Sequence, residues 1–322
     1  MRHVFIVNPA AGKKDSTEKL VAHVHTLFKA ARLDYALVRT EARGDATRLA
    51  AQFAADGVPT RFYACGGDGT LNEVIQAVAG LDHAAVTNVP KGTGNDFLKV
   101  FGPENRKRFT DLMALAQGPQ AAFDLMDCNG RLGLDVICAG VDARIARDVH
   151  RYDAVPLVRG IGAYITSLAT NILFKGISRP MKVTMGGQTW NEPISILCIC
   201  NARHYGGGFM PVAEAMPDDG VLDALLVPHV TRRTFIRLVG KYAKGLYAQF
   251  PDLITPYHGP GPIEFRAEAP ITLCVDGEIL EDTAFRVSLS EKRVNFFYPS
   301  GLSWNLPGTT PEKIGSYIPE SR

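Results

Sequence analysis

The stretch GGDGTLNE, residues 66–73, decides the fold of this chain, and it directly follows the apolar run FYAC at residues 62–65. Glycine tolerates positive φ and close backbone approach, so a strand that ends in such a loop can turn its N–H groups toward a phosphate. Apolar residues then recur at helical spacing from Leu71 to Val78. A strand, a glycine turn and a helix start together predict the place where an α/β protein holds a polyphosphate.

This loop matches neither of the common nucleotide fingerprints. A P-loop requires GxxxxGK followed by Ser or Thr, and a Rossmann turn requires GxGxxG, and residues 66–73 satisfy neither pattern. Taken alone, the loop is equally well explained as a tight glycine-rich turn.

Two further loops favour a shared ligand. The segment NPAAG at residues 8–12 follows the apolar run VFIV at 4–7, and PKGTGND at 90–96 follows a run that ends at Val89. In a parallel sheet such loops emerge at the carboxyl edge, where open α/β sheets bind ligands. Three loops of this form within the first hundred residues predict one phosphate site.

The pattern of elements changes along the chain. Strands at about 4–7 and Tyr35–Val38 and a helix at Ala46–Ala55 alternate as in a mostly parallel sheet. After Asp124 we expect an antiparallel sandwich with helical stretches at about 155–174 and 231–248. Its expected strands are Val136–Ala139, Met181–Met185, Ile194–Cys200, Val221–Val227, Ile271–Val275 and Phe285–Leu289.

Composition limits the class of protein. The 322 residues favour two domains, and a formal net charge of +2 predicts no general attraction to nucleic acid. The six cysteines form no CxxC pair and are expected to be core residues in a reducing compartment. No leader segment and no apolar run near the roughly 20 residues of a membrane span is visible, which predicts a cytoplasmic protein.

The three loops together make the chain resemble the diacylglycerol kinase catalytic-domain family, in its bacterial soluble lipid kinase branch. The resemblance continues through YGGG at 205–208, MPDDGVLD at 216–223 and VDGE at 275–278, and it spans about residues 2–299. It implies an NAD kinase- and phosphofructokinase-like α/β domain at 1–127, a β-sandwich-rich lipid-substrate domain at 128–299 and a tail at 300–322. The active site is then expected in the cleft between the two domains.

The family's nucleotide contacts fall on residues of the three loops and on one threonine at the end of the second strand. Those that match, as an ATP-binding set, are Asn8, Pro9, Ala10, Ala11, Gly12, Thr40, Gly66, Gly67, Asp68, Gly69, Thr70, Leu71, Asn72, Glu73 and Thr93.

The resemblance also implies catalytic roles for five acids. Glu278 is expected to take the proton of the acceptor hydroxyl, with Asp276 assisting. Asp68 is expected to meet Mg²⁺, which Asp96 and Asp124 help to organise with water. Four of these acids also have a purely structural explanation. Asp276 and Gly277 form a common hairpin turn dipeptide, and Asp68 could cap a helix. Asp96 could form an Asx turn, and Asp124 could cap the end of a strand.

A second Mg²⁺ site is implied at Met216, Asp219 and Val221, through two carbonyls and one carboxylate. An ordinary Asp-Gly turn between strands explains the same residues.

Membrane contact has two candidate segments. Residues 231–250 carry five cationic side chains and no acidic one, and their apolar residues fall on one helical face. A helix of this kind can lie on anionic lipid. More often, its apolar face packs on its own domain. The apolar stretch 157–174 fits an acyl-chain pocket and core packing equally well.

These features predict an ATP-dependent, Mg²⁺-requiring lipid kinase that acts at the membrane surface, with diacylglycerol as the first candidate acceptor. Phosphatidylglycerol, a sphingoid base and other lipid alcohols stay open, as does a homodimer. NAD kinase is disfavoured because its substrate motif is absent. The alternative from a different class is a regulator that binds nucleotide or lipid without catalysing a reaction. A chain without Asp68 or Glu278 would favour that alternative, but both residues are present here.

Overall fold

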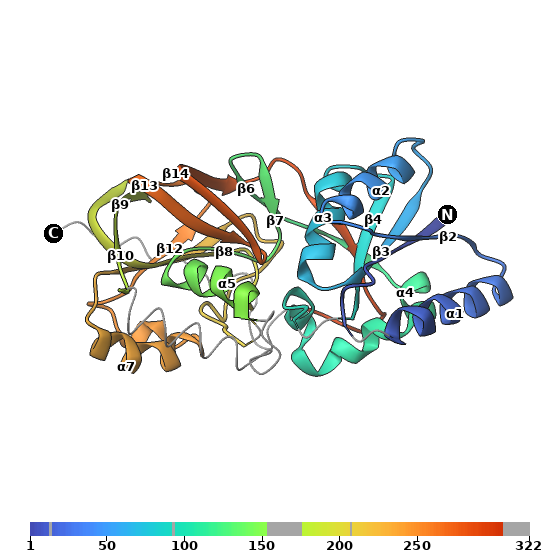
Figure 1. Cartoon of the computed structure of the whole chain (residues 1–322), viewed down its shortest axis with the longest axis horizontal. Helices are drawn as coiled ribbons and strands as arrows, with labels where there is room; N and C mark the ends of the chain where they lie inside the picture. The colour runs from blue at the N-terminus through green and yellow to red at the C-terminus, as the bar shows by residue number, and fades with distance from the viewer. Residues whose placement is uncertain (13–14, 92–93, 153–175, 207, 305–322) are drawn as a thin grey trace.

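The computed structural model describes residues 1–12, 15–91, 94–152, 176–206 and 208–304. Figure 1 shows two lobes side by side along the long axis, an α/β lobe that begins the chain and a β-rich lobe. The expected fold class is therefore confirmed. All six cysteines are buried and unpaired, as expected of core residues.

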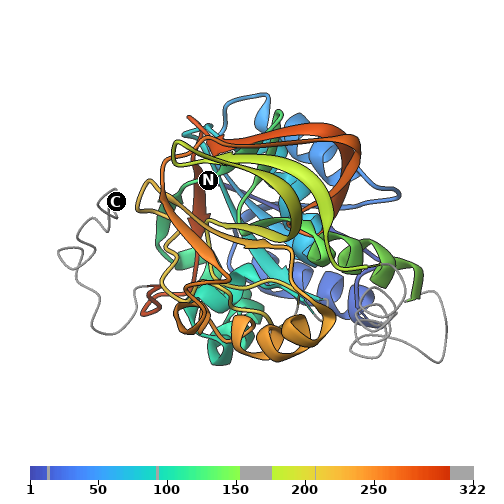
Figure 2. The same cartoon turned by 90° about the vertical axis from the view of Figure 1, so that its left-hand side faces the viewer.

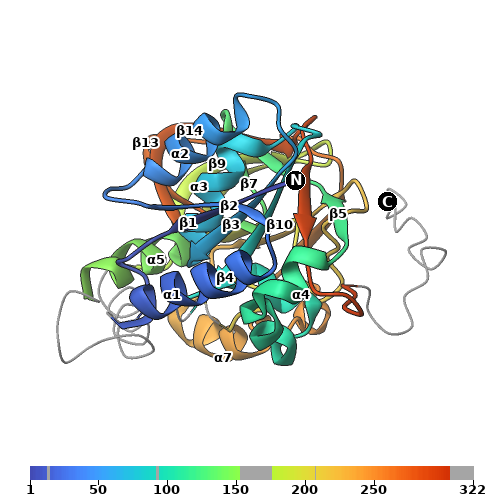
Figure 3. The same cartoon turned by 90° about the vertical axis from the view of Figure 1, so that its right-hand side faces the viewer.

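The first lobe is built on a six-stranded sheet in the order β2-β1-β3-β4-β15-β5. Its four parallel strands from the N-terminal half are β1 (Arg2–Val7), β2 (Asp34–Arg39), β3 (Thr60–Gly66) and β4 (Ala84–Pro90). The helices between them are α1 (Asp15–Ala30), α2 (Asp45–Ala54) and α3 (Asp68–Val78). Figure 3 shows α2 and α3 on one side of this sheet and α1 on the other.

The register of the sheet brings the three predicted loops together. Val7 pairs with Cys65, and Cys65 pairs with Val89, so β1, β3 and β4 end at one edge. Every residue of β3 is buried, because helices cover both faces of the sheet, and this explains its continuous apolar sequence.

The chain returns to this first sheet at its other end. Strand β15 (Val294–Phe297) pairs in parallel with β4 and antiparallel with β5 (Gln120–Phe123). The last strand of the segment assigned to residues 128–299 therefore lies in the first lobe. The short helices η1 (Phe97–Phe101), η2 (Pro103–Thr110) and α4 (Leu112–Gln117) connect β4 to β5.

The second lobe contains one antiparallel nine-stranded sheet, in which β9 pairs with both β10 and β13 and the other strands follow the order β12-β11-β10-β8-β13-β14-β6-β7. Its strands are β6 (Met126–Cys128), β7 (Arg131–Gly133), β8 (Val136–Gly140), β9 (Arg179–Met185), β10 (Gln188–Cys200), β11 (Leu222–Pro228), β12 (Thr255–Gly259), β13 (Ile263–Val275) and β14 (Glu278–Leu289). Five of the six strands expected from the sequence lie within these, and the sixth, Val221–Val227, begins one residue before β11.

Two of these strands share one place in the sheet. β8 and β9 both lie between β10 and β13, β8 against their C-terminal halves and β9 against their N-terminal halves. The chain leaves the end of β8 as helix α5 (Val141–Tyr152) and re-enters at β9. The expected helical stretch 155–174 falls outside the described residues.

Helix α7 (Arg232–Tyr242) accounts for part of the expected helix at 231–248, and the short helix η4 (Tyr247–Gln249) follows it. Figure 2 looks onto the β-rich lobe and shows α7 along its lower edge. The apolar side chains Phe235, Leu238 and Tyr242 are buried against the lobe itself. Within the described ranges, no helix combines the length and apolar character that a bilayer crossing requires.

Candidate active site

The glycine loop is joined to the loop after β4 through Asp68. Helix α3 begins at this residue, which is half-buried, and its carboxylate accepts the backbone N–H groups of Asn95 at 2.7 Å and Asp96 at 2.8 Å. Asp68 therefore fixes the position of the Asp96 backbone. This contact is formed within the protein, so Asp68 serves the site partly as a structural acceptor.

A glycine is required where the two loops meet. A methyl group placed on Gly94 would lie 2.7 Å from Asp68 Oδ2, which is closer than carbon and oxygen can approach. The glycine in GTGND thus lets the carboxylate reach the backbone of Asn95.

The first loop joins the same cluster. The Asn8 amide donates to Thr70 Oγ1 at 3.1 Å, and its Oδ1 accepts the N–H of Ala10 at 2.9 Å. Gly12 lies against the backbone carbonyl of Lys91, whose ammonium donates to the carbonyl of Asn8 at 3.1 Å. The three loops, distant in sequence, form one continuous edge.

Other residues of the predicted ATP-binding set have varied surroundings. The Glu73 carboxylate accepts the N–H groups of Gly44 at 2.9 Å and Ala46 at 3.1 Å, so it caps the start of α2. Leu71 lies in the hydrophobic core. Thr40 is buried at the end of β2, where its N–H donates to the carbonyl of Val7 at 3.0 Å.

Pro9, Ala10 and Ala11 follow the end of β1, and Gly66, Gly67 and Gly69 lie at the end of β3 and the start of α3, while Thr93 lies outside the described residues. ATP contact by the whole set stays a prediction.

The VDGE motif is both a hairpin turn and part of the site. Val275 pairs with Glu278 across a two-residue turn in which Asp276 and Gly277 have φ of 47° and 89°. Positive φ at both positions is the geometry of a type I′ turn. The plainer explanation of Asp276-Gly277 is therefore correct as local structure, and the turn directs Glu278 toward the first lobe.

Asp276 itself joins the two lobes. Its carboxylate accepts the N–H groups of Leu134 at 2.6 Å, Asp135 at 2.9 Å and Val136 at 3.1 Å, and the amide of Asn72 at 3.0 Å. Burial raises its pKa, while these hydrogen bonds oppose the rise. With four donors on two oxygens, Asp276 orients the turn. Its assisting role in catalysis stays a prediction.

Glu278 lies directly opposite the glycine loop. Its carboxylate forms an ion pair with Arg43 of the first lobe, and a methyl group placed on Gly69 would lie 3.4 Å from its Oε1. Arg43 is 71% exposed and lies in a polar loop before α2 that carries no motif, so the sequence does not predict its role.

Asp135 is a second residue of the site that was not predicted from the sequence. It is 7% exposed, and its Oδ1 has no hydrogen-bond partner. Burial, followed by repulsion from Asp276 and Asp96, raises its pKa well above the ordinary value. The available signal was a single acid inside the apolar run LGLDVIC at residues 132–138.

Acidic side chains at this junction repel one another. Burial first, and then the charge of Asp96, raises the pKa of Asp68 to about 7. Lys99 pairs with Asp96 and offsets part of this repulsion. A bound cation would offset the remaining repulsion between these carboxylates. The residues therefore fit Mg²⁺, because they carry negative charge and because Asp135 Oδ1 has no hydrogen-bond partner.

No three acidic, cysteine or histidine side chains in the described part of the chain converge as a preformed metal site. Mg²⁺ commonly keeps several waters and is shared with substrate phosphates, so it does not need such a cage.

Asp124 lies in a different contact group from Asp68 and Asp96. Its carboxylate accepts from Arg293 at 2.8 Å and from the N–H of Gly220 at 2.9 Å. It therefore holds the 216–221 loop, in which the Asp219 carboxylate accepts the N–H of Val221 at 3.2 Å. Burial raises the pKa of Asp219 to about 6.

The residues Met216, Asp219 and Val221 stay a predicted metal site. In the same loop, the Met216 sulfur accepts a hydrogen bond from Arg203 at 2.9 Å.

Two family models match this chain in succession. The diacylglycerol kinase catalytic domain matches residues 2–128, and the YegS C-terminal NAD kinase beta sandwich-like domain matches residues 135–297.

Similar proteins span nearly the whole chain. A "Probable lipid kinase YegS-like" of Pseudomonas aeruginosa PAO1 is 28% identical over 90% of this chain and 93% of its own, and one of Pseudomonas putida is 31% identical over 80% and 83%. Two solved structures from Bacillus anthracis Sterne share the fold. One putative diacylglycerol kinase has a TM-score of 0.72 and 24% sequence identity, over 92% of this chain and 96% of its own. A second putative diacylglycerol kinase has a TM-score of 0.71 and 26% sequence identity, over 92% of this chain and 97% of its own. The chain therefore belongs to the YegS-like branch of the diacylglycerol kinase catalytic-domain family, and it is a kinase.

Proposed function

We propose that this kinase transfers the γ-phosphate of ATP to a hydroxyl of a diacylglycerol-like lipid, with Mg²⁺, in the cleft between the two lobes. The observation that carries this proposal is the meeting of the loop edge with Glu278. Loops that suit phosphates lie on one side, and a carboxylate that suits a hydroxyl proton lies directly across from them.

The loop edge suits the polyphosphate of ATP. Backbone N–H groups of residues 67–70 lie at the start of α3, where the helix dipole favours anions. Asn8 and Thr70 are fixed against each other at the same edge, so the site is ordered before the nucleotide binds. Preorganised donors of this kind lower the cost of binding a charged transition state.

Glu278 is the proposed general base. As the lipid oxygen attacks the γ-phosphorus, the bond to the bridging oxygen of ADP breaks and a Glu278 oxygen accepts the hydroxyl proton. Its partner Arg43 is exposed, so a γ-phosphate bound at the loop edge would compete with Glu278 for the same guanidinium. Nucleotide binding would thus release the carboxylate for proton transfer.

Asp68, Asp96 and Asp135 are the proposed acidic neighbours of Mg²⁺. When bound, the ion neutralises charge on the phosphate oxygens during transfer. The protein's own contribution is to keep these carboxylates close and partly desolvated, through Asp68 bound to the backbone of Asn95 and Asp96.

Peripheral membrane contact is proposed for the exposed side of α7. Arg232, Arg233, Arg237 and Lys241 are exposed on this helix, and Ile236 is 59% exposed among them. A basic surface with one protruding apolar side chain suits an anionic bilayer surface. The buried apolar side chains of α7 would stay packed on the protein.

The deciding experiment is transfer of radiolabelled γ-phosphate to a panel of micellar lipid alcohols, with Glu278→Gln as the matched control. Label in diacylglycerol that disappears in the variant supports the proposal. Label in phosphatidylglycerol or a sphingoid base instead would change the acceptor but keep the reaction. If no lipid is labelled while calorimetry shows nucleotide binding, the chain is a silent binder.

A further inference from the structure

A cavity of about 770 Å³ opens in the β-rich lobe, where β8 ends at Gly140 and β9 begins at Arg179. The wall opposite is formed by β13. Its pairing with β14 shifts between Arg266 and Ile271, so residues 267–270, which line the cavity, leave the ladder. Bulges of this kind are commonly retained beside functional sites.

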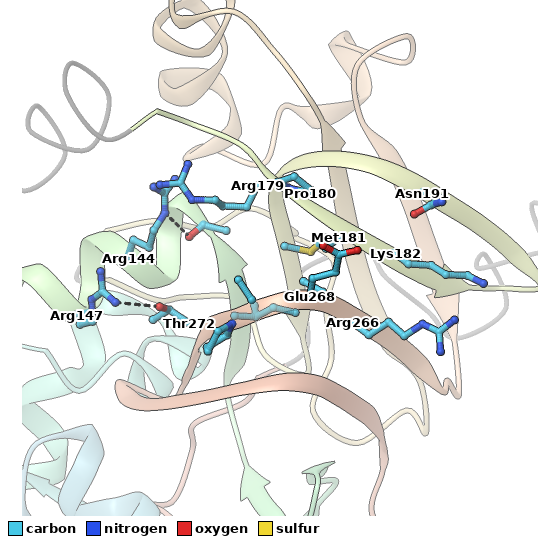
Figure 4. A pocket seen from close by; sticks show the side chains of 15 residues that line it. Arg144, Arg147, Arg179, Pro180, Met181, Lys182, Asn191, Arg266, Glu268 and Thr272 are labelled. Atoms are coloured by element: carbon cyan, nitrogen blue, oxygen red, sulfur yellow. Dashed lines mark hydrogen bonds between the residues drawn. The ribbon is translucent and has the colours of Figure 1, made fainter.

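The lining of this cavity is strongly basic. Five cationic side chains and one acidic one line it, namely Arg144, Arg147, Arg179, Lys182, Arg266 and Glu268. Figure 4 shows the first three arginines at one end of the cavity and Lys182 and Arg266 at the other, with Glu268 between them.

Two of the arginines are held firmly by the protein. Arg144 is buried and donates to the carbonyls of Gly176 at 2.9 Å and Ile177 at 2.8 Å. Arg147 donates to Thr272 Oγ1 at 3.1 Å and to Glu281 at 2.9 Å. Burial, followed by repulsion from Arg179 and Arg147, lowers the pKa of Arg144 to about 10.

Lys182 and Arg266 are arranged differently. They stand directly opposite each other in the register of β9 and β13, and neither has an ion-pair partner among the described residues. Like charges in this position destabilise a sheet. A neighbouring cross-strand pair on β13 and β14 has opposite charges instead, since Glu264 stands opposite Arg286 and forms an ion pair with it.

We propose that this cavity binds an organic phosphate, either the headgroup of an anionic glycerophospholipid or a soluble glycerophosphate. Arginine and lysine are the side chains that recognise phosphate oxygens, and an anion would offset the repulsion between Lys182 and Arg266. Met181, Pro270 and Ile271 supply an apolar wall for a glycerol or the first carbons of an acyl chain. The volume lies within the range of small-molecule sites.

The cavity is distinct from the candidate active site. Thr272 of β13 lines the cavity and lies four residues before Asp276 in the turn that follows this strand, a separation of about 13 Å at the spacing of an extended chain. A ligand here would touch the same hairpin that carries Glu278 without reaching it. Binding in this cavity therefore does not depend on which lipid is phosphorylated.

Calorimetry on the full chain tests this site, with a saturating non-hydrolysable ATP analogue and Mg²⁺ present to fill the phosphate loops. Three probes separate the ligand sources. Dihexanoylphosphatidylmethanol is anionic but has no hydroxyl to phosphorylate, dihexanoylphosphatidylcholine is its net-neutral counterpart, and sn-glycerol 3-phosphate is the soluble phosphate. The double variant Lys182→Ala/Arg266→Ala removes the opposed cations, and Arg286→Ala is the control because that cation is already paired.

We expect the anionic lipid to bind the natural chain at least tenfold more tightly than the double variant, with Arg286→Ala within twofold. Binding of glycerol 3-phosphate with the same dependence on Lys182 and Arg266 would assign the soluble source. Equal binding of the anionic and neutral lipids, no binding of either anionic probe, or an unchanged affinity in the double variant would each overturn the site. Thermal unfolding of all variants verifies that the substitutions leave the fold intact.

Discussion

The guanidinium of Arg43 and the carboxylate of Glu278 form an ion pair that crosses from one lobe to the other. The two residues are 235 positions apart in sequence. The pair lies beside Gly69, so the candidate base, its cationic partner and the glycine loop meet at one point.

Replacing Glu278 by Gln should lower transfer by about 10²- to 10⁴-fold, the usual contribution of a general base, because the amide cannot accept the hydroxyl proton. Nucleotide affinity should stay within a few-fold. Single-turnover transfer and nucleotide calorimetry measure the two effects separately. Substantial residual transfer would remove Glu278 as the base.

Replacing Arg43 by Ala should lower kcat by at least about tenfold, because in the proposed arrangement Arg43 would lie beside the γ-phosphate and stabilise its developing charge. Stability should hardly change, because an exposed ion pair contributes only about 0–1 kcal/mol. The matched control is Arg48→Ala, whose partner Asp45 lies 2.9 Å away on α2. Equal rates for the two variants would show that Arg43 has no part in transfer.

Replacing Gly94 by Ala should displace Asp68, because the added methyl group would lie 2.7 Å from Asp68 Oδ2. We expect at least a tenfold loss of activity and a higher Mg²⁺ requirement, with a folded protein. Gly240→Ala is the control, since a methyl group there has no neighbour within 4 Å. If a Mg²⁺ titration gives the same midpoint for both, Asp68 does not act with the metal.

Replacing Asp135 by Asn should stabilise the metal-free protein and impair transfer. The amide removes one of several mutually repelling charges but keeps the shape of a side chain whose Oδ1 lacks a partner. A rise of a few degrees in Tm in chelator, together with a weaker stabilisation by Mg²⁺, is the expected pattern. An unchanged response to Mg²⁺ would place the ion elsewhere.

Acid should destabilise the first lobe through His3. Burial, and then the charge of Arg61, lowers the pKa of His3 to about 4, below the value of about 6.5 for an unfolded chain. The unfolded state therefore binds the proton first as pH falls, so this stability is complete above about pH 6.5. It decreases toward pH 4, by about 3 kcal/mol in all.

Urea unfolding of the natural chain and of His3→Gln across pH 4.5–7.5 measures this contribution. The variant should show a shallower loss of unfolding free energy. Identical slopes would show that His3 is not the group responsible.

Much of the first lobe could be predicted from the sequence, because its signals are local. The glycine loop, its preceding strand and its helix lie within about twenty consecutive residues, and the parallel alternation places their ends at one edge. The residues found only in the structure act over long distances. Arg43 gains its role from a partner in the other lobe, and Asp135 from carboxylates on three other segments.

The second lobe shows the corresponding limit for strands. The apolar runs at 194–200 and 271–275 predict strands, but their full lengths include polar halves that pair with β9. Alternation along a strand does not reveal which neighbour it pairs with. The return of β15 to the first sheet was invisible for the same reason.

The position of β15 has a consequence for how the protein is made. Phe296 pairs with Val86, and among the strands that the structure describes in the first sheet, β5 pairs with β15 alone. While the chain emerges from the ribosome, the α/β lobe therefore cannot complete its sheet until nearly all of the β-rich lobe has been translated. The α/β lobe is therefore synthesised first, but its sheet is completed last. A chain truncated before residue 294 should expose the unpaired edge of β4 to other chains.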